Sequence, residues 1–210
     1  MVRTIENIYK LDDKKVTSIM LAIPREKFVP KKFIEIAYED RPVPIGFGQT
    51  MSQPFTVAKM THLLISANSK SENVKEWRVL EVGTGSGYQA AILSKLVNEV
   101  YTIEIIPELA RRAKTILKRL GYKNVQVRSG SGEWGWQEKA PFDGIIITAA
   151  LEKEVPKALV EQLKVGGVVV VPIGPHWSQT MIRFTKFGDD NLKKEKFGKF
   201  KFVPFIKQAN

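Results

Sequence analysis

The sequence predicts an α/β fold in which a doubly wound, mostly parallel sheet follows a helical N-terminal segment and ends in an antiparallel C-terminal hairpin. From Trp77 onward, apolar segments typical of strands alternate with helical segments, which is the pattern of a parallel sheet with helices on both faces. One apolar run stops abruptly at Gly83, Gly85 and Gly87, where a tight turn leads from a strand into a helix. Two later apolar segments have no helix between them, and they predict the hairpin.

The composition is that of one soluble globular domain. The 210 residues are 43% hydrophobic and 26% charged, enough to bury a substantial core, and no linker or repeat divides them. Within this domain we expect a helical segment and long loop over residues 1–75, an α/β core over 76–175 and antiparallel strands over 176–210. No stretch approaches the ~18 apolar residues of a membrane span, and the N-terminus lacks a signal-peptide core. We therefore expect a cytoplasmic protein that does not engage membranes.

The first part of the chain is expected to be mostly helical. Apolar residues at helical spacing predict a helix over residues 15–23, which prolines then interrupt. Residues 41–54 contain several prolines and glycines with almost no periodicity, so they predict a long loop, and long loops inside compact domains are usually functional. Helical spacing resumes over residues 55–64.

The core and the hairpin follow from the same periodicities. Strands are expected over residues 78–82, 100–104, 125–128, 142–148 and 167–172. Helices are expected over residues 87–96, 107–120 and 155–163. The hairpin is expected to pair residues 181–187 with residues 199–205.

The turn V-L-E-V-G-T-G-S-G-Y-Q at residues 79–89 predicts a site for a nucleoside-containing cofactor. Its glycines let the backbone approach a bound molecule, and the helix after the turn offers unpaired amides at its N-terminus. The spacing G-x-G-x-G differs from the dinucleotide fingerprint G-x-G-x-x-G, which disfavours a nicotinamide cofactor. With Glu81 two residues ahead, the turn resembles the signature of S-adenosylmethionine-dependent methyltransferases. A purely structural glycine turn is the alternative.

Two acidic residues stand at ends of expected strands. Glu104 ends the second core strand, about 20 positions beyond Gly83, a distance that suits a carboxylate accepting both ribose hydroxyls of the cofactor. Its alternative role is a helix-start acid, because Pro107 opens a helix just beyond. Asp143 begins a later strand, where a place beneath the cofactor and a local turn role are equally good interpretations.

Composition also narrows the chemistry. The chain has no cysteine and two histidines, which disfavours disulfides, thiol nucleophiles, metal centres and serine–histidine catalysis. The catalysed reaction is therefore expected to depend on the cofactor. A net charge of +11 favours acidic partners, although lysine-rich segments such as residues 193–201 are more often solvated faces.

Seven separate motifs together resemble the protein-L-isoaspartate O-methyltransferases, the protein-L-isoaspartyl/D-aspartyl carboxyl methyltransferase family. They are P-R-E-K-F-V-P at residues 24–30, P-I-G-F-G-Q-T-M-S-Q-P at 44–54, V-L-E-V-G-T-G-S-G-Y-Q-A-A at 79–91, G-W-Q-E-K-A-P-F-D-G-I-I-I-T-A-A at 135–150, Q-L-K-V-G-G at 162–167, V-P-I-G at 171–174 and F-V-P at 202–204. They cover residues 24–204 in the family's order, and the G-Q-T-x-S-Q-P loop is peculiar to that family.

The resemblance implies a Rossmann-like class I S-adenosylmethionine methyltransferase fold and transfer of a methyl group to the free carboxylate of L-isoaspartyl residues in damaged proteins. The product cofactor would be S-adenosylhomocysteine, no metal is involved, and the ester collapses to a succinimide that begins repair. Implied partners are isoaspartyl proteins and peptides rather than nucleic acid, and the chain is expected to be a monomer.

The family's functional positions carry over residue by residue. The catalytic serine falls on Ser52. Cofactor-binding positions fall on Glu81, Gly83, Thr84, Gly85, Ser86, Gly87, Glu104, Ser131 and Gly132. Substrate-binding positions fall on Gln49, Thr50, Met51, Val203 and Pro204.

The chemistry fits this sparse set of residues. A carboxylate is already ionised at neutral pH and a sulfonium is a good leaving group, so methyl transfer needs alignment rather than a strong base. Ser52 would donate a hydrogen bond that orients the attacking carboxylate. The alternative role of Ser52 is to cap the helix that begins near Phe55.

Ser131 departs from the family's pattern. The family usually carries G-D-G after the third strand, with an aspartate that accepts from the adenine amino group, whereas this chain reads R-S-G-S-G-E-W. A hydroxyl is a weaker acceptor than a carboxylate by about 1 kcal/mol. Adenine is therefore expected to bind more loosely, or through backbone groups or Glu133.

Two functions of other classes remain open. A tRNA methyltransferase would share the cofactor fold and suit the basic charge, but the chain lacks both a cysteine for attack on a pyrimidine and an N-P-P-Y or D-P-P-Y tetrapeptide. A non-catalytic binding module that retains the cofactor fold is supported by Ser131 alone.

Overall fold

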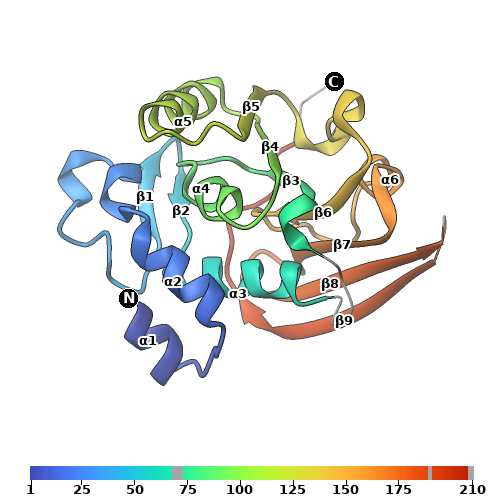
Figure 1. The fold of residues 1–210 in the computed structure, drawn as a ribbon, viewed down its shortest axis with the longest axis horizontal. Helices are drawn as coiled ribbons and strands as arrows, with labels where there is room; N and C mark the ends of the chain where they lie inside the picture. The colour runs from blue at the N-terminus through green and yellow to red at the C-terminus, as the bar shows by residue number, and fades with distance from the viewer. Residues whose placement is uncertain (68–72, 189–190, 208–210) are drawn as a thin grey trace.

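A mixed sheet forms the centre of the protein (Figure 1). The computed structural model describes residues 1–67, 73–188 and 191–207, and in these the sheet has seven strands in the order β5-β4-β3-β6-β7-β8-β9. The strands are β3 Arg78–Val82, β4 Glu99–Glu104, β5 Val125–Ser129, β6 Phe142–Ile147, β7 Leu163–Ile173, β8 Gln179–Gly188 and β9 Asn191–Phe200. The first five pair in parallel, and β8 and β9 add antiparallel, as the alternation of elements predicts.

The chain reverses its direction of winding between β3 and β6. Strand β3 pairs with β4 on one side and with β6 on the other, so connections leave this point toward both edges of the sheet. In open α/β sheets, ligands bind beside such a switch point at the carboxyl ends of the strands. The glycine turn follows β3 at that end.

Helices cover the two faces of the sheet unequally. They are α1 Val2–Asn7, α2 Lys14–Ala22, α3 Pro54–Ile65, α4 Tyr88–Ser94, α5 Pro107–Arg119 and α6 Lys157–Glu161, with 3₁₀ turns at Arg25–Phe28, Lys31–Phe33, Val74–Glu76, Gly132–Trp134 and Gln137–Lys139. Side chains such as Val79 and Val168 enter the larger core with α1 to α5, whereas their neighbours Leu80 and Val169 enter a smaller core with α6. This period of two is what strands buried on both faces require.

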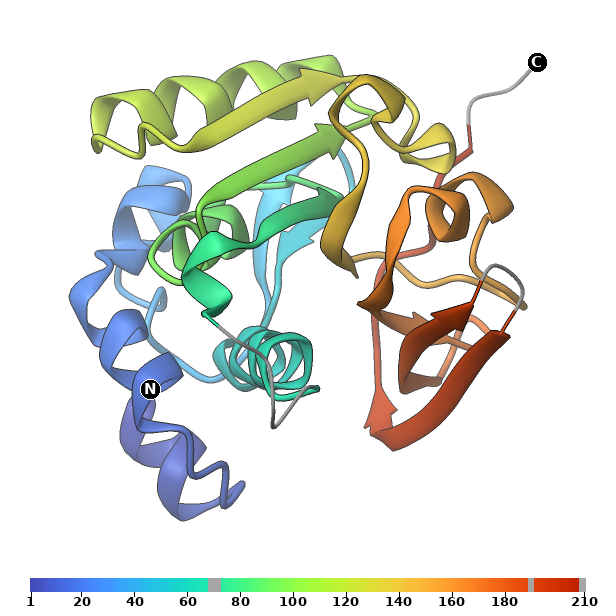
Figure 2. The same cartoon turned by 45° about the vertical axis from the view of Figure 1, so that its right-hand side comes forward.

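The N-terminal helices and the C-terminal hairpin lie on opposite sides of the molecule (Figures 1 and 2). Helix α2 begins at a side-chain cap, because Asp13 accepts a hydrogen bond from the amide of Val16. Helix α3 joins the two sides, since it contacts both α2 and β7. None of the helices in the described ranges has the length and apolar character needed to cross a membrane.

The loop expected over residues 41–54 is partly strand. Strands β1 Val43–Gly46 and β2 Gln49–Met51 pair antiparallel, and the turn between them passes through Gly46, Phe47 and Gly48, all with positive φ. Only Val43 and Ile45 point inward in β1, which is too short an alternation to stand out in the sequence. The guanidinium of Arg112 on α5 donates to the carbonyl oxygen of Ile45 and holds this hairpin over the core.

The bounds predicted for the second strand of the C-terminal hairpin are wrong. Strand β9 covers Asn191–Phe200 rather than residues 199–205. It is lysine-rich and pairs with β8 alone, as an edge strand with charged side chains does, and it therefore lacks an apolar pattern. The following residues run back across the carboxyl end of the sheet, where the amide of Ala150 donates to the carbonyl oxygen of Val203 at 2.8 Å.

The boundary between α6 and β7 also differs from the expectation. The helix is shorter than residues 155–163, and the strand begins at Leu163 rather than Gly167. The pairing of β6 with β7 shifts register between Phe142 and Gly144, which lets the extra residues join the strand as an irregularity.

Candidate active site

The glycine turn after β3 makes room at the switch point of the sheet. Gly83, Gly85 and Gly87 have φ values of 98°, 53° and 87°, a region that favours glycine. A side chain at Gly83 would also collide with the hydroxyl of Thr148 at the end of β6. The turn is therefore built so that nothing projects into the space beside β3 and β6.

Most amides of the turn are already used by the protein. The amides of Gly83 and Thr84 donate to the carbonyl oxygen of Ile103, and that of Gly87 donates to the carbonyl oxygen of Thr84. The side chain of Ser86 accepts from the amide of Tyr88 at 3.2 Å. The expectation of free amides at the start of α4 is thus not met at these positions, and the turn contributes space and shape.

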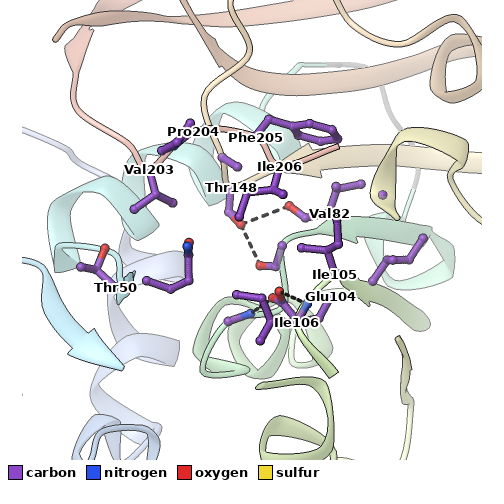
Figure 3. A pocket seen from close by; sticks show the side chains of 16 residues that line it. Thr50, Val82, Glu104, Ile105, Ile106, Thr148, Val203, Pro204, Phe205 and Ile206 are labelled. Carbon is purple, nitrogen blue, oxygen red and sulfur yellow. Dashed lines mark hydrogen bonds between the residues drawn. The ribbon is translucent and has the colours of Figure 1, made fainter. Parts of the chain in front are cut away.

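Three cavities meet at this end of the sheet. The main pocket lies between the glycine turn, Glu104 and the C-terminal segment (Figure 3). The inner pocket lies behind it, between the turn and α4, and includes Glu81 and Gln89. The outer groove, a cavity of about 620 Å³, opens from the β2 side toward Trp177 and β9.

Thr50 and Thr148 line all three cavities. Thr148 donates from its hydroxyl to the carbonyl oxygens of Val82 and Gly83, at 3.1 and 2.7 Å, and so fixes the end of β6 to the turn (Figure 3). Sequence reasoning missed Thr148. The sequence does place Thr148 at the carboxyl end of β6, the parallel neighbour of β3. Because the carboxyl ends of parallel strands meet at one edge of the sheet, this position could have indicated a site residue.

Glu104 is held by backbone amides on both of its oxygens. Oε2 accepts from the amide of Gly85 at 2.7 Å, and Oε1 accepts from the amide of Ile106 at 3.0 Å, just before α5 (Figure 3). The carboxylate is only 5% exposed and lines the main pocket. The contact with Ile106 agrees with the helix-start role, whereas the ribose role stays a prediction, for which Glu104 has unused lone pairs and a place in the lining of the main pocket.

Glu81 is the most unusual group of the site. Its side chain is completely buried, and neither carboxylate oxygen has a hydrogen-bond partner within the described residues. Burial raises the pKa of the Glu81 carboxyl to about 8; the hydroxyl of Thr102 opposes the rise and the charge of Glu104 adds to it. Unpaired buried carboxyl groups are costly, and this one faces the inner pocket, so the arrangement suits a cationic ligand group.

Ser52 lies where the inner pocket meets the outer groove. Its carbonyl oxygen accepts from Nη2 of Arg25 at 2.7 Å, while Nε of Arg25 donates to the carbonyl oxygen of Ala37. The guanidinium is fully buried 4.6 Å from the ring centre of Tyr88, and desolvation lowers the pKa of Arg25. The backbone of Ser52 is thus fixed at a position that lines both cavities.

The capping role considered for Ser52 is wrong. The N-cap residue of α3 is Gln53, and the carboxylate of Asp40 accepts from the amide of Phe55 at 3.0 Å. Asp143 stands at the start of β6, as expected, but neither a place beneath the cofactor nor a local turn role is observed, because its contacts are with the distant residues Arg78 and Lys164. Its carboxylate accepts from the amide of Arg78 and from the ammonium of Lys164, at the amino end of β6 and away from the glycine turn.

Most residues expected at the site line one of the three cavities. They are Gln49, Thr50, Met51, Ser52, Glu81, Gly83, Thr84, Gly85, Ser86, Glu104, Gly132, Val203 and Pro204. Gly87 and Ser131 do not. Gly87 lies against Leu117, where a Cβ would come within 3.2 Å of the leucine side chain.

Ser131 starts the 3₁₀ turn Gly132–Trp134. Its hydroxyl accepts from the amide of Glu133 at 3.4 Å, and Glu133 pairs with Lys207 at 3.2 Å. The adjacent Gly132 lines the main pocket and packs against Val82 so closely that a Cβ would collide with it. No cluster of three or more metal-ligating side chains occurs in the described ranges.

The family model described as Protein-L-isoaspartate(D-aspartate) O-methyltransferase matches residues 1–210. The Protein-L-isoaspartate O-methyltransferase of Dictyoglomus thermophilum is 48% identical over 195 residues, which are 92% of this chain and 84% of that protein. The Protein-L-isoaspartate O-methyltransferase 2 of Syntrophobacter fumaroxidans is 49% identical over 204 residues, which are 96% of this chain and 79% of that protein.

Solved structures of proteins with the same family name superpose on this chain. A protein-L-isoaspartate O-methyltransferase superposes with a TM-score of 0.83 at 30% identity, over 97% of this chain and 65% of that chain. A putative protein-L-isoaspartate O-methyltransferase from Plasmodium falciparum, in complex with S-adenosyl-L-homocysteine, superposes with a TM-score of 0.81 at 25% identity, over 99% of this chain and 98% of that chain.

Proposed function

The chain belongs to the protein-L-isoaspartate O-methyltransferase family, and we propose that its methyl transfer from S-adenosylmethionine to L-isoaspartyl carboxylates takes place where Ser52 faces the glycine turn. The protein is an S-adenosylmethionine-dependent methyltransferase with a Rossmann-like fold, and it starts the repair of damaged proteins through a succinimide. The observation that carries the location is the unpaired, buried Glu81 in a pocket that it shares with Ser52.

The residues present fit the cofactor. The ammonium of its methionine part would satisfy the carboxylate of Glu81, and its ribose hydroxyls would donate to the free lone pairs of Glu104. Gly83, Gly85 and Gly132 keep the main pocket clear of side chains. Thr84 and Ser86 line the inner pocket on the same side, and Gly87 sets the start of α4 behind them.

When bound, S-adenosylmethionine supplies a methyl group on a sulfonium centre. The protein contributes alignment, which is worth roughly 7–11 kcal/mol for well-oriented groups. We assign to Ser52 a hydrogen bond from its hydroxyl to one oxygen of the isoaspartyl carboxylate, which leaves the other oxygen free to attack. Arg25 fixes the backbone of Ser52 and so limits where its hydroxyl can lie. This role of the hydroxyl needs no general base.

The substrate side is formed by the β2 segment and the C-terminal segment. Gln49, Thr50 and Met51 line the cavities from β2, and Val203 and Pro204 line them from the C-terminal segment. Figure 3 shows Thr50, Val203 and Pro204. A polypeptide that enters between them would bring its side-chain carboxylate past Ser52 toward the main pocket. For adenine, we propose a place beside Gly132, with Ser131 acting through the 3₁₀ turn that it starts.

We further propose that the 210 residues work as one methyltransferase domain, as a cytoplasmic monomer whose partners are isoaspartyl proteins and peptides rather than nucleic acid or membranes. Support comes from the cores, which join α1 to α5 and the sheet into one unit, and from a groove of about 620 Å³ that leads to Ser52. The N-terminal Tyr9 and the C-terminal Val203 line the same groove, so neither end of the described chain stands apart.

The experiment is methyl transfer from labelled S-adenosylmethionine to two peptides that are identical except for L-isoaspartate or L-aspartate at one position. We expect base-labile label on the isoaspartyl peptide only. Unmodified tRNA serves as a third acceptor and tests the alternative function. Label on tRNA, or none on either peptide despite cofactor binding, would overturn the proposal.

A further inference from the structure

The outer groove carries features that the methyl transfer itself does not use. It begins at Thr50, Ser52 and Thr148 and runs outward between α3 and the end of β9. Its volume is about 620 Å³. Because only one carboxylate has to reach Ser52, the rest of this cavity is available to residues that flank the isoaspartate. The inference below rests on the proposed function and asks which flanking residues the groove accepts.

One wall of the groove is aromatic and rigid. The rings of Tyr9 and Phe55 are stacked 3.8 Å apart with an interplanar angle of 9°, and the ring of Phe200 lies 6.0 Å from Phe55. Trp177 lines the groove with 75% of its surface exposed. Large exposed aromatic side chains at a cavity are typical of contact surfaces, so this wall is suited to hold a polypeptide.

The charge of the groove has one sign. Among the described residues that line it, the charged ones are Lys199 and Lys201, and no carboxylate lines it. Neither lysine forms an ion pair in the described part of the chain, and Lys199 is held by a hydrogen bond from Nζ to the hydroxyl of Thr180 at 2.9 Å.

One acidic group, Asp40, contacts two residues of the groove wall, Gln53 and Phe55. The carboxylate of Asp40 accepts from Nε2 of Gln53 at 2.7 Å and from the amide of Phe55 at 3.0 Å. Neither contact involves Lys199 or Lys201, so none of the described carboxylates pairs with the two ammonium groups that a substrate would meet in the groove.

We propose that Lys199 and Lys201 make the outer groove selective for isoaspartyl segments that carry aspartate or glutamate close to the damaged residue. An ammonium on a long flexible stem can follow an acidic side chain at more than one position, which suits substrates of varied sequence. Such exposed pairs are individually weak and are screened by salt, so the selectivity is moderate and depends on ionic strength.

The test uses isoaspartyl peptides that differ only in having glutamate, glutamine or lysine at the flanking positions. At low salt we expect kcat/KM to be about three- to tenfold higher for the glutamate peptide than for the glutamine peptide, through KM, and lower again for the lysine peptide. High salt should remove most of the difference. The double variant Lys199→Gln and Lys201→Gln should methylate the glutamate and glutamine peptides equally well.

The matched control is Lys196→Gln, which removes one exposed positive charge on the same strand but outside the groove. Its peptide preference should equal that of the unmodified protein. Equal kcat/KM for the glutamate and glutamine peptides in the unmodified protein would overturn the inference, and so would a preference that persists in the double variant or is lost in the control. Methylation of the glutamine peptide distinguishes these outcomes from failure of the proposed function, in which no isoaspartyl peptide accepts label and both proposals fall.

Discussion

Arg25 donates a hydrogen bond from Nη2 to the carbonyl oxygen of Ser52, across 27 positions of the sequence and over 2.7 Å in the structure. The guanidinium is fully buried and forms no ion pair in the described part of the chain. Burying a cation without a counter-ion is costly, and the carbonyl oxygens of Ala37 and Ser52 and the ring of Tyr88 offset part of this cost. We regard Arg25 as a positioning residue for Ser52.

Replacement of Arg25 by lysine keeps the charge but loses the fork that reaches Ala37 and Ser52 together. We expect Arg25→Lys to lower kcat by about tenfold, equivalent to about 1.4 kcal/mol, while affinity for S-adenosylhomocysteine changes little. Steady-state kinetics and calorimetric titration measure the two quantities. A variant that loses thermal stability yet keeps its kcat would show that the contact is structural only.

Loss of the Ser52 hydroxyl should affect turnover far more than cofactor binding. We expect Ser52→Ala to reduce kcat by about 10- to 100-fold, because one hydrogen bond to a charged group is worth about 1–3 kcal/mol. The dissociation constant of S-adenosylhomocysteine should stay within about twofold. Ser18→Ala, an exposed serine on α2, is the control and should leave both unchanged. Equal losses of turnover and cofactor affinity in Ser52→Ala would contradict the assigned role.

Glu81 makes the stability of the cofactor-free protein depend on pH. The folded pKa of about 8 lies above the ordinary glutamate pKa of about 4.5, so between these values the folded protein holds a proton that the unfolded chain has lost. Stability should therefore fall as pH rises through this window, and Glu81→Gln should be more stable than the unmodified protein above about pH 8. Thermal unfolding across pH tests this, and an advantage confined to acidic pH would contradict it.

The same residue should make cofactor binding release a proton. A cationic group beside Glu81 favours its ionised form, so below about pH 8 the carboxyl must lose its proton as the cofactor enters. Affinity should then rise by up to about tenfold per pH unit toward pH 8. Calorimetry in buffers of different ionisation enthalpy measures the proton. Glu81→Gln should bind more weakly and without this proton release; identical release from the variant would locate the titration elsewhere.

Ser131 offers a gain-of-affinity test. The Ser131 hydroxyl caps the amide of Glu133 and lines no cavity, whereas the longer side chain of an aspartate can present a carboxylate oxygen to adenine beside Gly132. Ser131→Asp should therefore tighten S-adenosylmethionine binding by about fivefold, or about 1 kcal/mol. Equilibrium binding measures the change, with Ser131→Asn as the uncharged control of similar size. An unchanged dissociation constant in the aspartate variant would remove the adenine role from this position.

Prediction from sequence succeeded where one segment carried its own signal. Strand β3 was placed at its observed bounds because an apolar run buried on both faces ends in glycines. The second hairpin strand was misplaced because β9 is an edge strand whose lysines hide its periodicity. The sequence picked out residues of the glycine turn and of β2 that line the cavities, but it did not single out Thr148 as lining them or Arg25 as holding the backbone of Ser52. The contacts of Thr148 and Arg25 join segments that are far apart in the sequence, so a local sequence pattern cannot predict them.

The C-terminal segment that crosses the sheet has a consequence for synthesis of the protein. Val203, Pro204 and Phe205 line the main pocket, and backbone bonds with Ala150 hold them there. Tyr9, near the other end, lines the groove beside them. The main pocket therefore gains this wall only after the segment beyond β9 has been synthesised and has folded back across the sheet, so a chain that stops before Val203 would lack the wall and should be inactive.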